Sequence, residues 1–288
     1  MPTHRIQPGA HRETDLRLEP FLFSADTALV TAVASIGVPL QSRVGAVVVD
    51  WERSEKSQRQ AAAKEIIGVS TQIAPDTPAD LRRIVEISAV PVLCRIDAWR
   101  QCGPADLEAA VAAGAAEIIL PMVRGPEEVA EALDLAAGRV GVGVMIETVD
   151  AVASAEEIAS LPISRAYVGL MDLAIERRTH DIFDPLYDGV LERMSRVFAA
   201  MPFGFGGLTL PGLGHPIPTR LLAAEMVRLG CDFTFLRRSF IRDSGDDPAS
   251  GVAAIREMIQ EMTARSPDRV TQDRQLLATF IGGRPRPL

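Results

Sequence analysis

The chain has 288 residues, of which 47% are hydrophobic and 24% charged, and its formal net charge is −8. This length suits one barrel of alternating strands and helices, which typically needs roughly 250 residues, and the acidic charge argues against nucleic-acid and anionic-membrane partners. The three scattered cysteines fit neither a disulfide framework nor a zinc site, and no stretch has the apolar core of a signal peptide or a transmembrane span, so we expect a cytoplasmic protein.

Continuous apolar segments alternate with longer amphipathic ones along the chain, which is the pattern of βα units around a parallel sheet. Eight strands are expected at residues 20–23, 44–50, 91–95, 117–120, 140–147, 166–169, 203–208 and 233–236. The intervening helices are expected at residues 26–36, 54–65, 78–87, 104–113, 126–137, 151–159, 186–199 and 218–229. Several of these helices begin at proline, which suits a first helical position because its missing N–H would have no partner there. Eight such strands predict a closed α/β barrel.

A few segments depart from this alternation. Residues 66–73 are a candidate for an added strand, and the polar residues 175–185 are expected to form a loop over Asp172. Residues 252–262 are expected to form a further helix, and the polar residues that follow are expected to pack against another part of the assembly and then become disordered. We therefore expect one domain, with an N-terminal extension over 1–18, the barrel over 19–265 and a C-terminal tail over 266–288.

Lysine is almost absent from this chain. Of the 30 basic residues only Lys56 and Lys64 are lysines, and both fall in the polar segment that is expected to be a helix. An aldolase that forms an imine needs a desolvated lysine at a strand end facing the substrate. Imine chemistry is therefore not expected.

Acidic residues follow two of the expected strands. Glu147 lies in Val-Met-Ile-Glu-Thr (144–148), and Asp172 lies in Tyr-Val-Gly-Leu-Met-Asp-Leu (167–173). The carboxyl ends of barrel strands are where catalytic groups collect, and carboxylate oxygens are the ligands that Mg²⁺ prefers. For either residue alone, a cap of the following helix is the favoured explanation. The two together predict a divalent-cation site.

Two further strand ends carry charged residues. Arg95 ends the run Pro-Val-Leu-Cys-Arg, and its guanidinium has two interpretations: it binds a substrate carboxylate through two parallel hydrogen bonds, or it forms a salt bridge on the side that faces the helices. Asp50 and Glu52 follow the apolar residues 45–49. His180 and His215, the only histidines of the barrel region, lie in expected loops, where a solvated histidine is the simpler interpretation.

Five short motifs occur in order along most of the chain. They are Val-Val-Asp-Trp-Glu (48–52), Val-Leu-Cys-Arg (92–95), Gly-Ala-Ala-Glu-Ile-Ile-Leu-Pro-Met-Val (114–123), Met-Ile-Glu-Thr (145–148) and Val-Gly-Leu-Met-Asp-Leu (168–173). With these motifs the chain resembles the HpcH/HpaI aldolase and citrate lyase beta-subunit family of the phosphoenolpyruvate/pyruvate superfamily, over residues 44–236.

The resemblance implies a TIM (β/α)8 barrel that forms a homo-oligomer, a trimer or a hexamer, often with its last helix exchanged between subunits. It implies Glu147 and Asp172 as ligands of Mg²⁺ or Mn²⁺, and Arg95 as the partner of the pyruvate-like oxygens of a substrate. Asp50 and Glu52 are the other catalytic candidates. The candidate substrate-binding residues besides Arg95 are Pro121, Gly169, Leu170 and Met171.

The sequence also departs from the family pattern. Arg53 stands where the pyruvate aldolases carry a histidine that serves in base chemistry, and an arginine stays protonated at any working pH. Leu170 and Met171 replace the usual small pair, and Met145 replaces a common glutamine, so we expect a bulkier and more apolar pocket. Met122 stands where the CoA-thioester branch normally has lysine.

Three functions follow from these observations. The first is a class II, divalent-metal-dependent carbon–carbon lyase or aldolase acting on a 2-oxo acid or a related carboxylate. The second is an acyl-CoA thioester lyase like the citrate lyase beta subunit or malyl-CoA lyase, and the third is a non-catalytic metal-binding accessory subunit. For an enzyme without the histidine, proton transfer falls to a metal-bound water first, then to Glu52 or a loop histidine.

Overall fold

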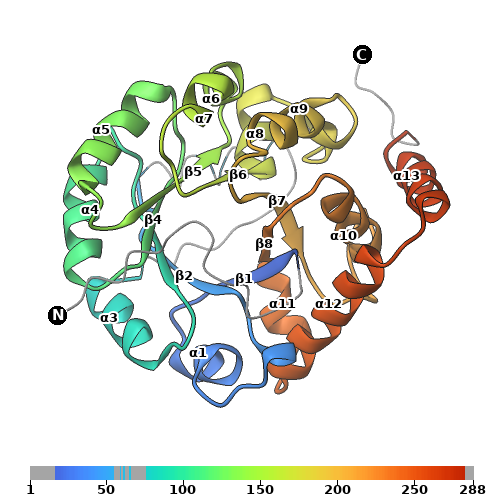
Figure 1. Cartoon of the computed structure of the whole chain (residues 1–288), viewed down its shortest axis with the longest axis horizontal. Helices are drawn as coiled ribbons and strands as arrows, with labels where there is room; N and C mark the ends of the chain where they lie inside the picture. Colours follow the sequence, from blue (N-terminus) through green and yellow to red (C-terminus); the bar gives the residue numbers. More distant parts are fainter. Residues whose placement is uncertain (1–16, 55–58, 60, 62–64, 66–75, 283–288) are drawn as a thin grey trace.

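Eight parallel strands form a closed barrel with helices around it (Figure 1). The computed structural model describes residues 17–54, 59, 61, 65 and 76–282. Each strand pairs with the next in chain order, and β1 closes the barrel against β8. The strands are β1 (Glu19–Phe23), β2 (Ala46–Asp50), β3 (Val92–Arg95), β4 (Glu117–Leu120), β5 (Gly141–Ile146), β6 (Arg165–Val168), β7 (Phe203–Leu208) and β8 (Phe233–Leu236). The predicted TIM (β/α)8 barrel is confirmed.

The helices form the outer layer (Figure 1). Pro78 opens one of them behind a capping box in which Thr77 and Asp80 bind each other's backbone N–H. Among the described residues, no helix combines the length and the apolarity that a bilayer span requires. The helices are α1 (Thr27–Ala34), α3 (Pro78–Ile87), α4 (Gly103–Ala112), α5 (Pro126–Ala136), α6 (Val149–Ala153), α7 (Ala155–Ala159), α8 (Leu170–Arg177), α9 (Val190–Val197), α10 (Thr219–Arg228), α11 (Arg238–Asp243), α12 (Pro248–Thr263) and α13 (Pro267–Gly282), with short 3-10 turns at Leu40–Ser42 and Asp184–Leu186.

The structure corrects the expected position of Asp172. This residue is the third of α8, not the end of a strand, and the first three residues of the expected polar loop belong to the same helix. The apolar side chains of Leu170, Leu173 and Ala174 are buried on one face, so helical spacing explains the segment better than an extended strand end does. The candidate strand at residues 66–73 lies outside the described residues.

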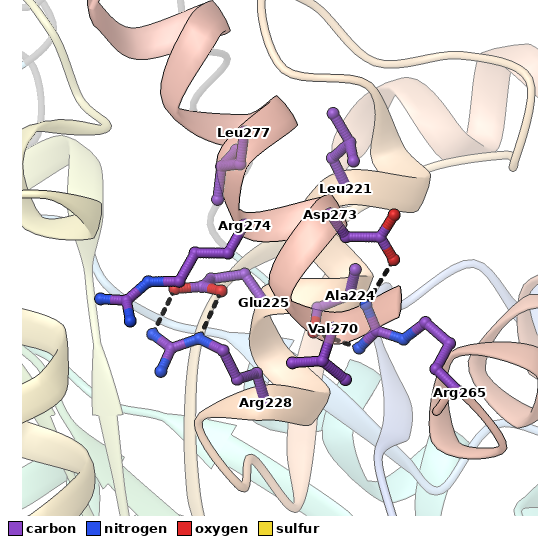
Figure 2. Close-up of a pocket in the computed structure, with 9 residues that line it drawn as sticks. All are labelled: Leu221, Ala224, Glu225, Arg228, Arg265, Val270, Asp273, Arg274 and Leu277. Atoms are coloured by element: carbon purple, nitrogen blue, oxygen red, sulfur yellow. Dashed lines mark hydrogen bonds and ion pairs between the residues drawn. The ribbon is translucent and has the colours of Figure 1, made fainter. Parts of the chain in front are cut away.

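The C-terminal residues that were expected to pack against another part of the assembly before becoming disordered form a helix that was not expected, α13 (Pro267–Gly282). This helix lies against α10, and Figure 2 shows the contact. Arg265 donates from Nη1 to Asp273 at 2.7 Å and from Nη2 to the carbonyl of Ala224 at 2.8 Å, and the Leu277 side chain is buried. The crevice in Figure 2 leaves no room for a water molecule, so it is a packing contact rather than a binding site.

The barrel interior has its own core, separate from the layer between strands and helices. It is made of alternate strand residues, since successive side chains of a strand point to opposite faces of the sheet. Its members are Phe21, Ala46, Val48, Leu93, Ile119, Met145, Tyr167, Phe233 and Phe235. By the same alternation, the next inward positions toward the carboxyl ends of the strands are Asp50, Arg95, Glu147 and Arg237.

A paired charge lies inside the opposite, amino end of the barrel. Arg165 donates from Nε and Nη2 to the two oxygens of Glu117, at 2.6 and 2.8 Å, and its guanidinium lies over the rings of Phe21 and Phe233. Each of the two charges is thus neutralised and hydrogen-bonded by the other, as a buried charge requires. The side chains that chemistry could use lie instead at the carboxyl end, which we call the rim.

Candidate functional site at the carboxyl rim of the barrel

Glu147 lies at the centre of the rim, directly after β5, and is only 1% exposed. Its Oε1 accepts a hydrogen bond from the backbone N–H of Met122 at 2.9 Å. A Cβ at position 169 would come within 2.2 Å of Glu147 Oε2, so only glycine lets the end of β6 approach this carboxylate so closely. The backbone after β4 and the backbone after β6 therefore both approach the Glu147 carboxylate closely.

Met122 has a left-handed backbone conformation with φ of 53°, which a bulky residue rarely adopts. Such a conformation costs on the order of 1–3 kcal/mol and persists only where its surroundings impose it. Here it directs the N–H of Met122 at Glu147. This role of Met122 was not expected, and its one signal in the sequence is its place in the strand-to-turn motif at 114–123.

Asp172, in the first turn of α8, lies on the same side of the barrel, with a side chain that is 21% exposed. Its Oδ1 accepts a hydrogen bond from Arg59 Nε at 3.1 Å, and Arg59 also pairs through Nη2 with Glu52. No motif pointed to Arg59, since this residue lies in a polar segment that was expected to be a helix. The structure brings this arginine between two of the predicted site residues.

Arg95, at the end of β3, bridges two carboxylates of the neighbouring strand. Its Nε and Nη2 donate to the two oxygens of Asp50 at 2.9 and 2.7 Å, and its Nη1 lies 3.1 Å from Glu52 Oε2. The guanidinium also lies 5.0 Å from the ring centre of Phe23. Arg95 therefore does form a salt bridge, but with Asp50 and Glu52 at the rim and not on the side of β3 that faces the helices, as that interpretation expected. The same contacts hold the planar guanidinium in a fixed orientation.

The electrostatics of the rim favour a bound cation. Burial, followed by the charges of Asp172 and Glu52, raises the pKa of Glu147 to about 8, and burial also raises the pKa of Asp172. Burial works to lower the pKa of Arg95, but the charges of Asp50 and Glu52 raise it overall. Among the described residues, four carboxylates thus share the rim with four arginines: Asp50, Glu52, Glu147 and Asp172 with Arg59, Arg95, Arg237 and Arg238. A cation bound by Glu147 and Asp172 would stabilise the ionised forms of these two carboxylates.

The residues fit a hard divalent cation. Glu147 and Asp172 supply carboxylate oxygens, and after burial the charge of Asp172 is the next cause of the raised pKa of Glu147. A bound cation would favour the ionised form that a ligand needs. Among the described residues no group of three or more histidine, cysteine, aspartate or glutamate side chains has a metal-binding arrangement. Two carboxylates are nevertheless enough for Mg²⁺, which keeps several of its waters.

The raised pKa of Glu147 predicts how the stability of the chelator-treated protein changes with pH. Between about pH 4.5 and pH 8 the folded protein holds a proton on Glu147 that the unfolded chain releases, so the free energy of unfolding falls as pH rises through this window. Carboxylates with a lowered pKa, such as Asp80 and Asp247, change the free energy of unfolding only at a pH below this window. Urea midpoints measured at about pH 5 and pH 8 check this. Glu147→Gln should reduce the fall, and an equally steep fall in that variant would contradict the assignment.

The remaining predicted residues occupy distinct places. Pro121, Gly169 and Leu170 are buried, and Met171 is half-buried. Arg53, in the place of the family's histidine, points to α4, where its Nη2 bonds both oxygens of Asp106 at 2.9 and 3.0 Å. His180 and His215 are both exposed. The structure therefore brings together Asp50, Glu52, Arg95, Glu147 and Asp172, but not the two histidines.

A second hollow, of about 570 Å³, lies away from the rim. It is lined by residues near the ends of α9 and α10 and the starts of β7 and β8, among them Arg17, Ser195, Met201 and Asp232. Conserved chemistry in barrels of this type gathers at the carboxyl ends of the strands, and these residues lie at the amino ends. The charged cluster of the rim, rather than this hollow, is the candidate site.

Several solved structures share the fold of this chain, although no family model and no curated protein matches its sequence. RipC from Yersinia pestis has a TM-score of 0.56 at 14% identity, over 88% of this chain and 98% of its own. An HpcH/HpaI aldolase/citrate lyase family protein from Burkholderia cenocepacia has a TM-score of 0.56 at 17% identity, over 87% and 96%.

CitE from Mycobacterium tuberculosis, in complex with magnesium and acetate, has a TM-score of 0.56 at 17% identity, over 90% of this chain and 97% of its own. The same protein in complex with magnesium, acetoacetate and coenzyme A has a TM-score of 0.56 at 16% identity. The fold that the sequence resemblance implied is confirmed. The chain thus shares the barrel of the HpcH/HpaI aldolase and citrate lyase structures across most of its length.

Proposed function

We propose that this chain is a divalent-metal-dependent carbon–carbon lyase or aldolase of the HpcH/HpaI type, acting on a 2-oxo acid or a related carboxylate. The observation that carries the proposal is the convergence of the Glu147 and Asp172 carboxylates with the Arg95 guanidinium on one rim of the barrel. The shared fold supports it, as does the magnesium in the CitE structures.

Glu147 and Asp172 are the residues that would hold the metal, Mg²⁺ or Mn²⁺. Glu147 is fixed by the Met122 N–H, and Asp172 by the first turn of α8. When bound, the metal supplies Lewis-acid stabilisation of the negative charge that develops on the ketone oxygen of a 2-oxo acid. The imine route would need a lysine, and Lys56 and Lys64 lie outside the described residues.

Arg95 and the start of α8 would bind the substrate's carboxylate. Asp50 and Glu52 orient the Arg95 guanidinium, so it meets the substrate without losing further side-chain freedom. The first N–H groups of a helix have no partner within the helix, and in α8 they belong to Leu170, Met171 and Asp172. Because the Leu170 side chain is buried, only its backbone is suited to this role. Pro121 and Gly169 shape the adjoining turns.

Within the part of the chain that the structure describes, no side chain takes the place of the histidine that the pyruvate aldolases carry. Glu52 is engaged through Oε1 by Arg59 and through Oε2 by Arg95, which suits a charge-orienting role better than that of a proton acceptor. We therefore expect His180→Ala and His215→Ala each to retain turnover within about tenfold, which corresponds to about 1.4 kcal/mol of barrier. Steady-state kinetics of the two variants test this. A loss of about a thousandfold, with substrate binding intact, would make that histidine the general base.

Deuterium exchange tests the proposal directly. The protein with Mg²⁺ or Mn²⁺ is expected to exchange the methyl protons of pyruvate in D₂O, and a chelator should stop the exchange. The CitE complex with acetoacetate and coenzyme A supports the acyl-CoA lyase as a second candidate, and exchange into acetyl-CoA in place of pyruvate would select it. Exchange into neither compound would favour a non-catalytic accessory subunit. The homo-oligomer and the cytoplasmic location stay predictions.

A further inference from the structure

We propose that the ion pair between Arg124 and Glu176 is a clamp that positions the two candidate metal ligands relative to each other. Arg124 belongs to the turn that holds Glu147, and Glu176 belongs to the helix that carries Asp172. The inference rests on the proposed function for the identity of the ligands, and it assigns a role to two residues outside the five motifs. Because they act through Glu147 and Asp172, Arg124 and Glu176 are positioning residues.

The turn after β4 contacts the end of β5 through two successive residues. The backbone N–H of Met122 donates to Glu147 Oε1 at 2.9 Å. The carbonyl of Val123 accepts a hydrogen bond from the Thr148 hydroxyl at 2.6 Å. Thr148 directly follows Glu147 and also caps α6, because its Oγ1 accepts from the N–H of Ala151 at 3.0 Å. The position of this turn therefore determines where the Glu147 carboxylate is held.

The next residue of the same turn, Arg124, reaches α8. Its Nη1 and Nη2 donate to the two oxygens of Glu176 at 2.8 and 2.7 Å, a bidentate arrangement that fixes direction as well as distance. Its Nη1 also lies 3.6 Å from Asp150 of α6, and α6 and α8 contact each other. The backbone N–H of Arg124 donates to Glu128, in the first turn of α5, at 3.0 Å. Arg124 is thus anchored by its backbone and links the turn to α8 through its side chain.

Glu176 lies one helical turn after Asp172 on α8. Residues four positions apart share one face of a helix, so the two carboxylates lie along the same side of α8. Hydrogen bonds along a helix fix the distance between its successive turns, and a contact that holds Glu176 against the turn after β4 therefore also holds Asp172. Glu147 and Asp172 are thus joined through this turn, the ion pair and one turn of α8.

The clamp is expected to matter more for cation binding than for stability. The Arg124 side chain is 46% exposed, and partly exposed ion pairs typically stabilise a fold little. A cation such as Mg²⁺, by contrast, requires nearly ideal octahedral geometry with short bonds to its ligands. A small displacement of α8 relative to the turn after β4 would therefore weaken cation binding while the barrel stays intact.

Conservative substitutions separate position from charge. Arg124→Lys keeps the positive charge but loses the planar fork, and Glu176→Asp keeps the negative charge on a shorter side chain. The full chain is titrated calorimetrically with Mg²⁺ and Mn²⁺, and both variants are expected to bind Mg²⁺ about three- to tenfold more weakly than the wild type, less than the loss caused by removing a group bonded directly to a ligand. Arg139→Lys is the matched control, because Arg139 makes the same bidentate contact with Glu108 on the outer side of the barrel, at 2.8 and 2.6 Å.

Charge-removing substitutions give different expectations for a clamp and for a purely electrostatic effect. If the pair acted only through its charges, Arg124→Gln would strengthen cation binding and Glu176→Gln would weaken it, since a cation is repelled by the first group and attracted by the second. For a clamp, both substitutions should weaken binding, and the double variant should bind no more weakly than the weaker single variant. Urea midpoints of all variants should stay close to that of the wild type. Wild-type affinity in Arg124→Lys and Glu176→Asp, or stronger binding by Arg124→Gln, overturns the proposal.

A measurement without metal tests the clamp independently of the proposed function. In the chelator-treated protein, the Met122 N–H is expected to exchange with D₂O faster in Arg124→Lys and Arg124→Gln than in the wild type, because the turn that presents it to Glu147 is no longer held. Mass spectrometry of a peptide that spans residues 117–125 reports this exchange, and a peptide from β8 is the internal control. If exchange responds to the substitutions but the wild type binds no Mg²⁺, the proposed metal centre fails while the clamp stands. Unchanged exchange at Met122 in the folded variants overturns the clamp, whatever their cation affinities.

Discussion

Replacing Glu147 with glutamine is expected to abolish divalent-cation binding while the barrel stays folded. Glutamine has nearly the same shape, and its side-chain oxygen can still accept the hydrogen bond from Met122 N–H. The substitution removes a charge whose burial is unfavourable, as the pKa of about 8 indicates, so the metal-free protein should not lose stability. Cation affinity should fall by at least about a hundredfold, because one of two charged ligands is lost. Asp172→Asn should act in the same direction.

Calorimetric titration with Mg²⁺ and Mn²⁺ measures this loss. Glu108→Gln provides a matched control, since Glu108 is a surface carboxylate paired with Arg139 on the outer side of the barrel. Thermal melting with and without the cation should show stabilisation of the wild type and of the control, but not of Glu147→Gln. Unchanged cation affinity in both Glu147→Gln and Asp172→Asn would rule out the proposed metal centre.

Replacing Arg95 with methionine is expected to remove substrate binding and to destabilise the fold as well. The buried guanidinium neutralises Asp50 and Glu52, and taking one partner from a buried ion pair typically costs about 3–5 kcal/mol. Glu52 keeps its contact with Arg59, so we expect the lower part of that range. Urea denaturation measures the stability, and oxalate titration measures the binding.

Arg95→Lys separates the two roles of this residue. Lysine keeps the positive charge beside Asp50 and Glu52, so most of the stability should return, and metal binding should survive. The compact ammonium cannot reproduce the planar fork, so oxalate affinity should still fall by at least about tenfold. Oxalate binding at the wild-type level by Arg95→Lys would make Arg95 a structural residue only.

The strands were predicted well because their signal is local. Each expected strand agrees with the observed one within two residues at either end, because a strand that is buried on both faces has a continuous apolar sequence. The helices were predicted less well, because the expected helix at 151–159 is split at Ser154, and α8, α11 and α13 were missed. Their stability comes from tertiary packing, such as the buried Leu170 and Leu277, that a polar local sequence does not reveal.

By itself, the sequence determined the barrel, because the closure of eight parallel strands follows from hydropathy and element order. It also singled out Glu147 and Asp172 as the candidate metal ligands, and it placed Asp50 and Arg95 at strand ends. Only the tertiary structure decided which groups meet. Arg59 lies 113 residues before Asp172, its hydrogen-bond partner at 3.1 Å, and the Met122 N–H reaches Glu147 across 25 residues. Packing likewise determined that Arg53 points to Asp106 and that Arg237 donates to the carbonyl of Gly207. Side-chain directions depend on neighbours from other strands, and this long-range information has no local signature in the chain.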